Sequence, residues 1–159
     1  MTKQHASLLL TTAQLWQFSL NYYGIREVKT ACLNLQNQFN GNVNLLLLLV
    51  WLDQHQLTIQ AEDWVSIENT LDHSESLLLP YRELRRKLKN HVSEPLYREA
   101  LEFELQLEQR QQSDLVEHIN TLTLYRATEK PLTQQYCLKL GCEHLFTSFE
   151  TSAEQLKMK

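Results

Sequence analysis

The sequence contains little glycine and proline, with only three of each among its 159 residues. It also lacks alternating runs of valine, isoleucine and threonine, whereas leucine, glutamine, glutamate and lysine are abundant. Glycine and proline mark turns and alternating β-branched residues build strands, so their scarcity argues against a sheet protein. The composition therefore predicts an all-α fold, and the length suits one domain with a substantial core.

Cysteines are few, the net charge is small, and long apolar segments are missing. The three cysteines Cys32, Cys137 and Cys142 cannot all pair with one another, and their spacing matches no zinc motif. We therefore expect reduced thiols in a cytoplasmic protein without a bound metal or other cofactor. The net charge of −4 gives no general reason to bind nucleic acid or an anionic membrane. The longest apolar run, Leu45 to Leu52, is far shorter than the about 20 residues that span a bilayer.

The most apolar segment runs from Val43 to Leu52, and Asn44 is its only polar residue. Asn40-Gly41 interrupts the chain just before it, and Asn42 is placed to cap a helix that starts at Val43. A helix that is apolar all round must be buried on all sides. We therefore predict a single compact bundle of about six to seven helices around a central helix at 43–52.

Start and stop signals place further helices on either side of this centre. Thr11-x-x-Gln14 has the form of a capping box and Gly24 provides a stop, so a helix is expected over 12–23. The other helices expected from apolar spacing cover 26–38, 60–72, 72–89, 94–120 and a C-terminal segment from 131. All belong to a single domain, 1–159, with tails at 1–10 and about 150–159.

Two residues interrupt these helical patterns. Pro80 lies inside the segment 72–89, so this helix is expected to kink there or to begin at the proline. Gly141 lies inside the C-terminal segment and is expected to weaken that helix in its middle.

Five short motifs follow one another in order along the chain. They are Leu15-Trp16-x-Phe18, Cys32-Leu33-x-Leu35-Gln36, Val43-Asn44-Leu45-Leu46, Leu84-Arg85-Arg86-x-Leu88-Lys89 and Glu104-Leu105-x-x-Glu108. From about residue 15 to 111 the chain therefore resembles a small family of uncharacterised proteobacterial proteins, a domain of unknown function. The resemblance implies a cytoplasmic helical domain, and it brings no activity, cofactor or site residue with it.

The most pointed candidates for a site are Glu104 and Glu108, which fall on the core-facing stripe of the predicted 94–120 helix. Two carboxylates one turn apart on such a stripe are costly unless they are paired. One hypothesis is a substrate or metal site, although no Glu-x-x-His pair accompanies them, as it does in carboxylate-bridged metal centres. We favour the alternative of an internal ion pair with Arg82, Arg85 or Arg86 of the preceding helix.

The preceding helix carries a basic face formed by Arg82, Arg85, Arg86 and Lys89, within residues 82–91. Such a face is a candidate for binding nucleic-acid phosphates. The next predicted helix is rich in acids, and two antiparallel helices of opposite charge neutralise each other. We therefore expect intramolecular pairing, and nucleic-acid binding is the weaker alternative.

Asn44 and Gln36 border the most apolar part of the chain, and together with Trp16 they could orient a small ligand in a pocket. The plainer interpretation is that these amides satisfy helix ends and loop carbonyls. Cys32 falls at a core position with no histidine nearby in sequence, so we expect a small buried side chain rather than a nucleophile.

The sequence contains no glycine-rich phosphate loop, no nucleophile elbow and no His-Glu-x-x-His motif. We therefore predict a non-catalytic cytoplasmic protein that regulates or interacts through contacts with another protein or with a second copy of itself. Neither a membrane nor nucleic acid is the expected partner. The alternative is a small-molecule-binding or enzymatic domain that uses Glu104 and Glu108, with Asn44, Gln36 and Trp16 as neighbours.

Overall fold

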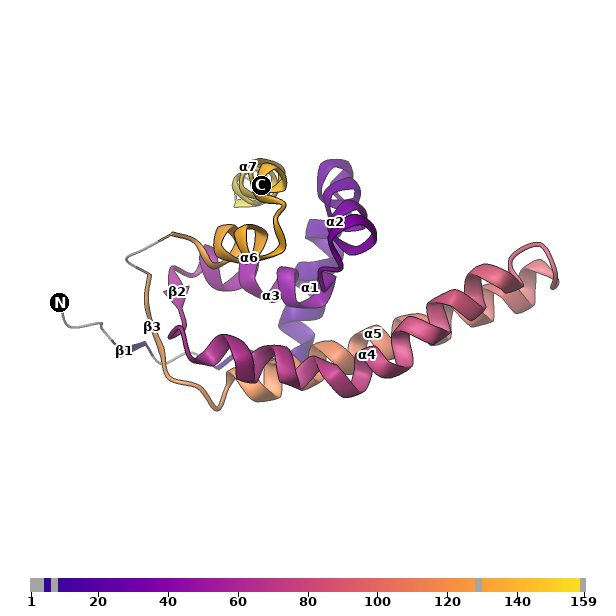
Figure 1. Ribbon diagram of the computed structural model, residues 1–159, viewed down its shortest axis with the longest axis horizontal. Helices are drawn as coiled ribbons and strands as arrows, with labels where there is room; N and C mark the ends of the chain where they lie inside the picture. The colour runs from indigo at the N-terminus through magenta and orange to yellow at the C-terminus, as the bar shows by residue number, and fades with distance from the viewer. Residues whose placement is uncertain (1–4, 7–8, 128–129, 158–159) are drawn as a thin grey trace.

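The computed structural model describes residues 5–6, 9–127 and 130–157 (Figure 1). Three very short strands, β1 (His5–Ala6), β2 (Leu57–Thr58) and β3 (Leu124–Arg126), form antiparallel pairs in the order β1-β3-β2. The other regular elements of the described structure are helices, so the predicted all-α fold is confirmed. Its helices are α1 (Thr12–Tyr23), α2 (Arg26–Phe39), α3 (Val43–Gln54), α4 (Asp63–Leu88), α5 (Glu94–Ile119), α6 (Leu132–Leu140) and α7 (Phe146–Lys157), with a 3₁₀ turn at Glu143–Leu145.

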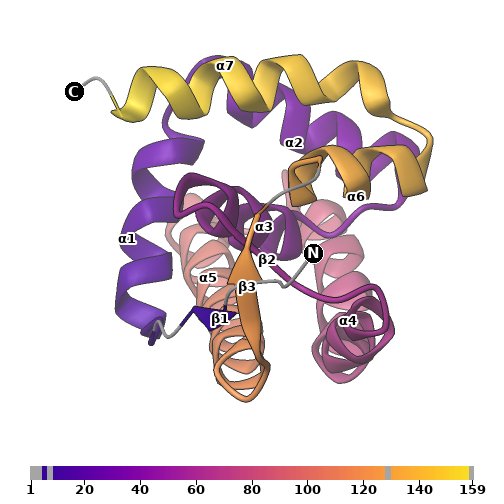
Figure 2. The same cartoon turned by 90° about the vertical axis from the view of Figure 1, so that its left-hand side faces the viewer.

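Helix α3 is the centre of the core, as predicted. Every residue from Asn44 to Leu52 is buried, and the helix contacts α1, α2, α5, α6 and α7, which surround it in Figure 2. Its start is fixed by Asn42, whose side-chain oxygen accepts a hydrogen bond from the Leu45 N–H at 2.7 Å. Gly41 is required just before it, because a Cβ there would collide with side chains of α2 and α6.

The predicted capping box at the start of α1 is also confirmed. The Thr11 N–H donates to the Gln14 side chain at 3.0 Å, and the Gln14 N–H donates to the Thr11 hydroxyl at 3.1 Å. Cys32 on α2 is fully buried, and burial is the main cause that raises the pKa of its thiol to about 12. The thiol therefore behaves as the predicted core side chain.

The predicted division between two helices at residue 72 is wrong, because α4 is one continuous helix of 26 residues. Pro80 lies inside it on the exposed side. The buried stripe of α4 continues past the proline from Leu71 through Leu78 to Arg82, all packed along α5. This packing outweighs the roughly 3 kcal/mol by which an interior proline disfavours a helix.

The C-terminal segment also differs from its prediction. Gly141 ends α6 in a left-handed conformation, with φ of +82°, rather than weakening the middle of one helix. Helix α7 extends to Lys157, into the predicted C-terminal tail, because Phe149 and Ser152 are buried on its inner face. In the predicted N-terminal tail, His5–Ala6 pairs with β3, and residues 1–4 and 7–8 lie outside the described residues.

Helices α4 and α5 form a long antiparallel hairpin, and Figure 1 shows its outer half projecting beyond the other helices. We call this outer half, residues 77–107, the arm, and the rest of the described structure the body. None of the helices in the described part of the chain is both long and apolar enough to cross a membrane.

Asp53 attaches α6 to the core. Its carboxylate accepts hydrogen bonds from the N–H groups of Leu132 and Thr133, at 2.8 and 3.0 Å, in the first turn of α6. Pro131 at the N-cap position has no side-chain group that could do this, so a distant residue supplies the cap. Burial raises the pKa of Asp53 in spite of these hydrogen bonds.

Asp53→Ala is expected to lower the free energy of unfolding by about 1–2 kcal/mol, because it leaves two N–H groups at a helix start without their cap. Urea denaturation at pH 7 measures the change. Asp72→Ala, at an exposed position of α4, is the matched control and should have almost no effect. Equal stability of the two variants would contradict a capping role for Asp53.

Candidate functional site

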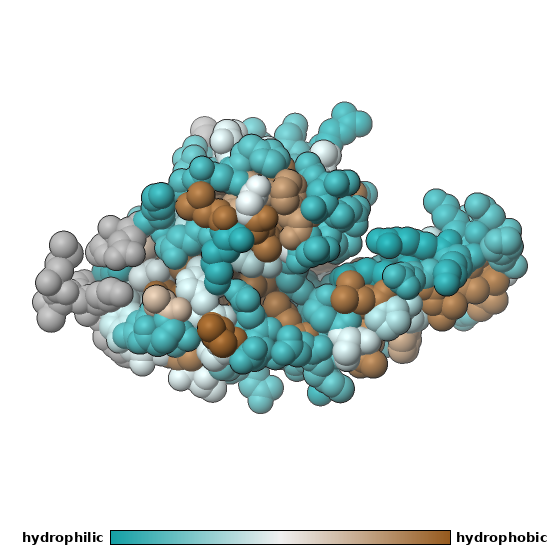
Figure 3. Space-filling model, in the orientation of Figure 1, coloured by the Kyte–Doolittle hydropathy of each residue, from teal (hydrophilic) through white to brown (hydrophobic). Residues whose placement is uncertain are grey.

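Most of the site residues singled out in the sequence line one cleft. It lies where the arm leaves the body, has a volume of about 290 Å³, and is visible as a hollow in Figure 3. Helices α1, α2 and the start of α3 form one side, and α4 and α5 form the other. The predicted site residues on its wall are Trp16, Gln36, Asn44, Arg82, Arg85, Glu104 and Glu108. Arg86 and Lys89 of the predicted basic face do not line it and are exposed.

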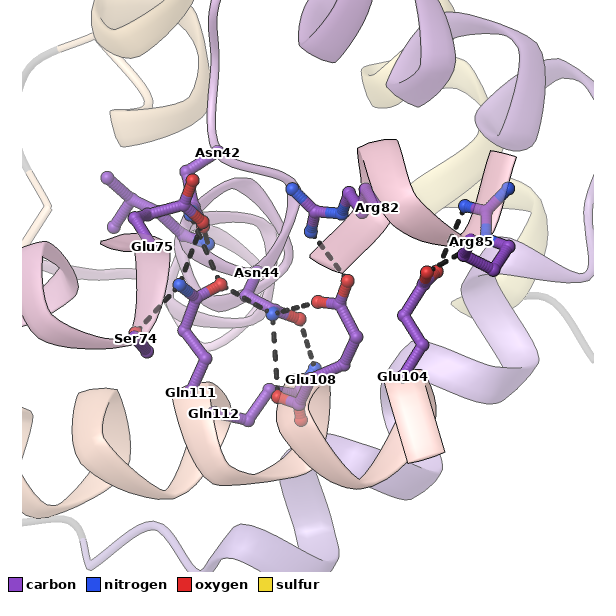
Figure 4. A network of polar contacts seen from close by, with 11 residues as sticks. Asn42, Asn44, Ser74, Glu75, Arg82, Arg85, Glu104, Glu108, Gln111 and Gln112 are labelled. Carbon is purple, nitrogen blue, oxygen red and sulfur yellow. Dashed lines mark hydrogen bonds and ion pairs between the residues drawn. The ribbon is translucent and has the colours of Figure 1, made fainter. Parts of the chain in front are cut away.

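Both carboxylates of the cleft are paired with guanidinium groups (Figure 4). Glu104 accepts two hydrogen bonds from Arg85, at 2.9 and 3.2 Å. Glu108 accepts one from Arg82 at 2.6 Å and one from the Asn44 amide at 2.7 Å. The hydrogen bond to Glu104 is the leading cause that raises the pKa of Arg85. The predicted pairing between these helices is confirmed for these two ion pairs.

This pairing limits the chemistry that Glu104 and Glu108 can perform. A guanidinium partner stabilises the charged form of a carboxylate, and so favours a structural ion pair at both glutamates. Among the described residues, no group of three or more histidine, cysteine, aspartate or glutamate side chains is arranged to hold a metal ion. The two ion pairs therefore join α4 to α5 across the hairpin.

A buried polar layer extends from the cleft into the core, centred on Gln111 of α5, which is fully buried. Its side-chain oxygen accepts hydrogen bonds from Asn44 and Asn42, at 2.8 and 3.1 Å. Its amide nitrogen donates to Ser74 and Glu75 of α4, both at 2.9 Å. Figure 4 shows how this layer joins the start of α3 to both helices of the hairpin.

Gln112, the next residue of α5, is also fully buried and lies at the inner end of the cleft. Its nitrogen donates to the Ser19 hydroxyl at 2.9 Å and to the Asn44 side-chain oxygen at 3.1 Å. Its own oxygen is buried without a hydrogen-bond partner among the described residues. Nearby, burial raises the pKa of Tyr23, and the charge of Glu108 adds to this effect.

Sequence reasoning missed Gln111, Gln112, Ser74 and Glu75. The available signal was their spacing: Gln111 and Gln112 follow Glu108 by three and four residues, and so share its side of α5. Asn44 was interpreted either as a ligand contact or as a residue that satisfies backbone groups. The structure instead makes it the central contact of the polar layer, bound to Glu108 and to both glutamines.

The arm carries a second surface, formed by apolar residues of both helices. We call it the outer face and define it by Leu77, Tyr81, Leu84 and Leu88 of α4 and Leu96, Ala100, Phe103 and Leu107 of α5. None of these residues lines the cleft. Figure 3 shows apolar side chains gathered along the arm.

The fold and the cleft define a small all-α domain in which a polar layer joins the central helix α3 to the inner half of a long helical hairpin. The chain belongs to the family described as protein of unknown function (DUF2390), whose model matches residues 14–115. The matched segment contains α2 to α4 and most of α1 and α5, and it includes every residue that lines the cleft. No curated protein and no solved structure matches the chain. The resemblance found in the five sequence motifs is thus confirmed at the level of the family.

Proposed function

We propose that this is a non-catalytic cytoplasmic protein that acts through protein contacts, and that the outer face of its arm pairs with the same face of a second copy. The observation that carries the proposal is an apolar surface on a projecting hairpin. Four large side chains of this face, Leu77, Leu84, Leu96 and Phe103, are each 50–52% exposed. Monomeric proteins rarely leave such a continuous apolar surface without a partner.

The spacing of these residues is typical of a helical bundle. The outer-face residues of each helix are separated by four, three and four positions. This spacing holds for Leu77, Tyr81, Leu84 and Leu88 on α4 and for Leu96, Ala100, Phe103 and Leu107 on α5. This is the repeat that packs helices side by side in coiled coils and four-helix bundles. The two stripes adjoin each other, since the Tyr81 and Phe103 rings lie 5.4 Å apart. Each arm therefore presents half of a four-helix bundle.

Charge and symmetry favour a second copy as the partner. The stripe from Leu77 to Leu88 is about 17 Å long at 1.5 Å per residue, and two helices side by side, each about 10 Å wide, give a face of roughly 350 Å². This is about half of the about 800 Å² per partner found in stable specific interfaces, so the pairing is expected to be weak. Two exposed, oppositely charged residues border the outer face. Lys87 on α4 follows Leu84 by three residues, and Glu99 on α5 follows Leu96 by three residues. A two-fold axis along the arm brings α4 of one copy beside α5 of the other, so that these opposite charges meet.

The alternatives draw less support from the geometry. Glu104 and Glu108 both have guanidinium partners, which weighs against an enzyme built on these carboxylates. Arg82 and Arg85 are engaged in the same pairs, which removes half of the basic face proposed for nucleic acid. The net charge of −4 also disfavours binding to phosphates.

Leu84→Glu is expected to convert the protein from dimer to monomer, because it places two carboxylates in the centre of the paired face. Sedimentation equilibrium should give about twice 18.8 kDa for the natural chain and 18.8 kDa for the variant. We expect the dissociation constant to rise at least 100-fold.

Leu79→Glu is the matched control, because Leu79 is 56% exposed on the same helix but lies off the outer face. This variant should remain a dimer. A natural chain that stays monomeric at 100 μM, or a Leu84→Glu dimer as tight as the natural one, would overturn the proposal.

A further inference from the structure

We infer that the arm is hinged at Pro80 and closes onto the body, so that Leu105 of the arm packs against Leu20 and Leu33 across the cleft. Arm closure buries the walls of the cleft, a different surface from the outer face, and it does not depend on arm pairing. Three features support it: apolar walls on both sides of the cleft, a proline on the side of α4 opposite the cleft, and ion pairs that make the two helices of the arm move together.

The cleft separates two apolar walls that belong to the same chain. Leu20 and Leu33 of the body are 53% and 42% exposed, and Leu105 of the arm is 52% exposed. Trp16 and Tyr23 add two partly buried aromatic side chains from α1. Figure 3 shows the hollow that separates the arm from the body. Because contact between the two walls removes apolar surface from water, the hydrophobic effect favours a closed cleft.

Pro80 is placed to bend the arm toward the body. It is exposed inside α4. The cleft-lining Arg82 and Arg85 lie about 200° and about 140° around the helix from it, at about 100° per residue, so the proline is on the side opposite the cleft. Its ring pushes against the carbonyl group of Ser76, four residues earlier, and it lacks the N–H that would bond this carbonyl. The helix therefore opens on the proline side and bends toward the cleft.

Ion pairs beyond the hinge make both helices of the arm move together. Arg85 donates two hydrogen bonds to Glu104, at 2.9 and 3.2 Å, and Arg82 donates one to Glu108 at 2.6 Å. Glu108 also accepts a hydrogen bond from the Asn44 amide of the body at 2.7 Å, which keeps the base of the arm in place. A bend in α4 is therefore transmitted to α5, and the continuous helix α5 follows by curving.

A small bend is enough to move the arm measurably. Arg85, which pairs with the residue next to Leu105, is five residues and therefore about 8 Å beyond Pro80. A bend of about 20° moves this level of the arm by about 3 Å, which is close to the thickness of one layer of water. Leu88, at the end of α4, is about 12 Å beyond the proline and moves by about 4 Å.

The distance between two nitroxide spin labels, measured by pulsed electron paramagnetic resonance, reports arm closure. The labels are attached at Gln38→Cys on α2 and His91→Cys at the arm tip, both exposed positions, whereas the three natural cysteines are fully buried. All chains also carry Leu84→Glu, which removes arm pairing, so every distance lies within one chain. Pro80→Ala is expected to straighten α4 and to lengthen the mean distance by about 4 Å.

Pro95→Ala is the matched control, because Pro95 lies in the first turn of α5, where a proline does not kink a helix. This variant should leave the distance between the labels unchanged. Equal distances in the Pro80→Ala chain and in the chain that keeps Pro80 would overturn the inference.

A second pair of variants tests the apolar contact. Leu105→Asp places a carboxylate where the closed arm meets the body, so the distance should lengthen by a similar amount although Pro80 is kept. Leu138→Asp changes a leucine of α6 that is 42% exposed and does not line the cleft, and it should leave the distance unchanged. Circular dichroism verifies that each variant keeps its helix content. An unchanged distance in Leu105→Asp would show that the two walls do not meet, and would overturn the inference.

Discussion

Leu48→Asp is expected to abolish the cooperative unfolding transition of this protein. Leu48 is 0% exposed at the middle of α3, and its neighbours along the helix from Asn44 to Leu52 are buried as well. A carboxylate introduced there has no guanidinium or amide partner in the apolar core, and burying it costs several kcal/mol in addition to the lost packing of the leucine. The sum is comparable with the whole stability of a small domain, about 5–15 kcal/mol.

Circular dichroism during heating measures this effect, since loss of the fixed core replaces a sharp transition by a broad one. Leu79→Asp is the matched control, because this leucine of α4 is 56% exposed and its replacement should preserve a sharp transition. A Leu48→Asp protein with a sharp transition near that of the natural chain would show that α3 is not the centre of the core.

The central helix could be predicted because its sequence allows one environment only. Asn44 is the only polar residue of this segment, so the helix has no polar face that could be exposed to solvent. Asn42 marks its N-terminus as the N-cap residue. The course of the chain at Pro80 and Gly141 could not be predicted in this way. Pro80 is tolerated because α5 packs along the buried side of α4, and Gly141 adopts a left-handed conformation that the following turn requires. The outcome at Pro80 depends on a contact with another segment that sequence spacing does not reveal, whereas the stop at Gly141 is a local C-cap signal.

The two ion pairs could be predicted for a related reason. Adjacent helices joined by a short turn lie antiparallel, so opposite charges near their junction come to face each other. The burial of the glutamines in the polar layer could not be predicted, because glutamine on an amphipathic helix is usually exposed to solvent. Gln112 is buried only because α1 crosses α5 at Ser19, and the body wall of the cleft depends on the same crossing. Sequence alone therefore supplied the candidates, and tertiary packing decided which of them share a site.

Glu108→Leu is expected to lower the free energy of unfolding by about 3 kcal/mol, a larger effect than its partly exposed position suggests. The substitution leaves the Arg82 guanidinium, on a side chain only 9% exposed, without its carboxylate, and it also removes the acceptor of the Asn44 amide. An uncompensated buried charge is far more costly than the gain from an intact pair. Urea denaturation at neutral pH measures the loss.

The matched control is the exposed pair of Glu94 and Arg98, with side chains 83% and 68% exposed. Glu94→Leu should change stability by no more than about 0.5 kcal/mol, because water screens a surface pair. Arg82→Met combined with Glu108→Leu should recover most of the stability lost in Glu108→Leu alone, since apolar side chains of similar volume then fill the junction. A double variant as unstable as the single one would show that Glu108 acts through Asn44 and the polar layer, and that its pairing with Arg82 adds little.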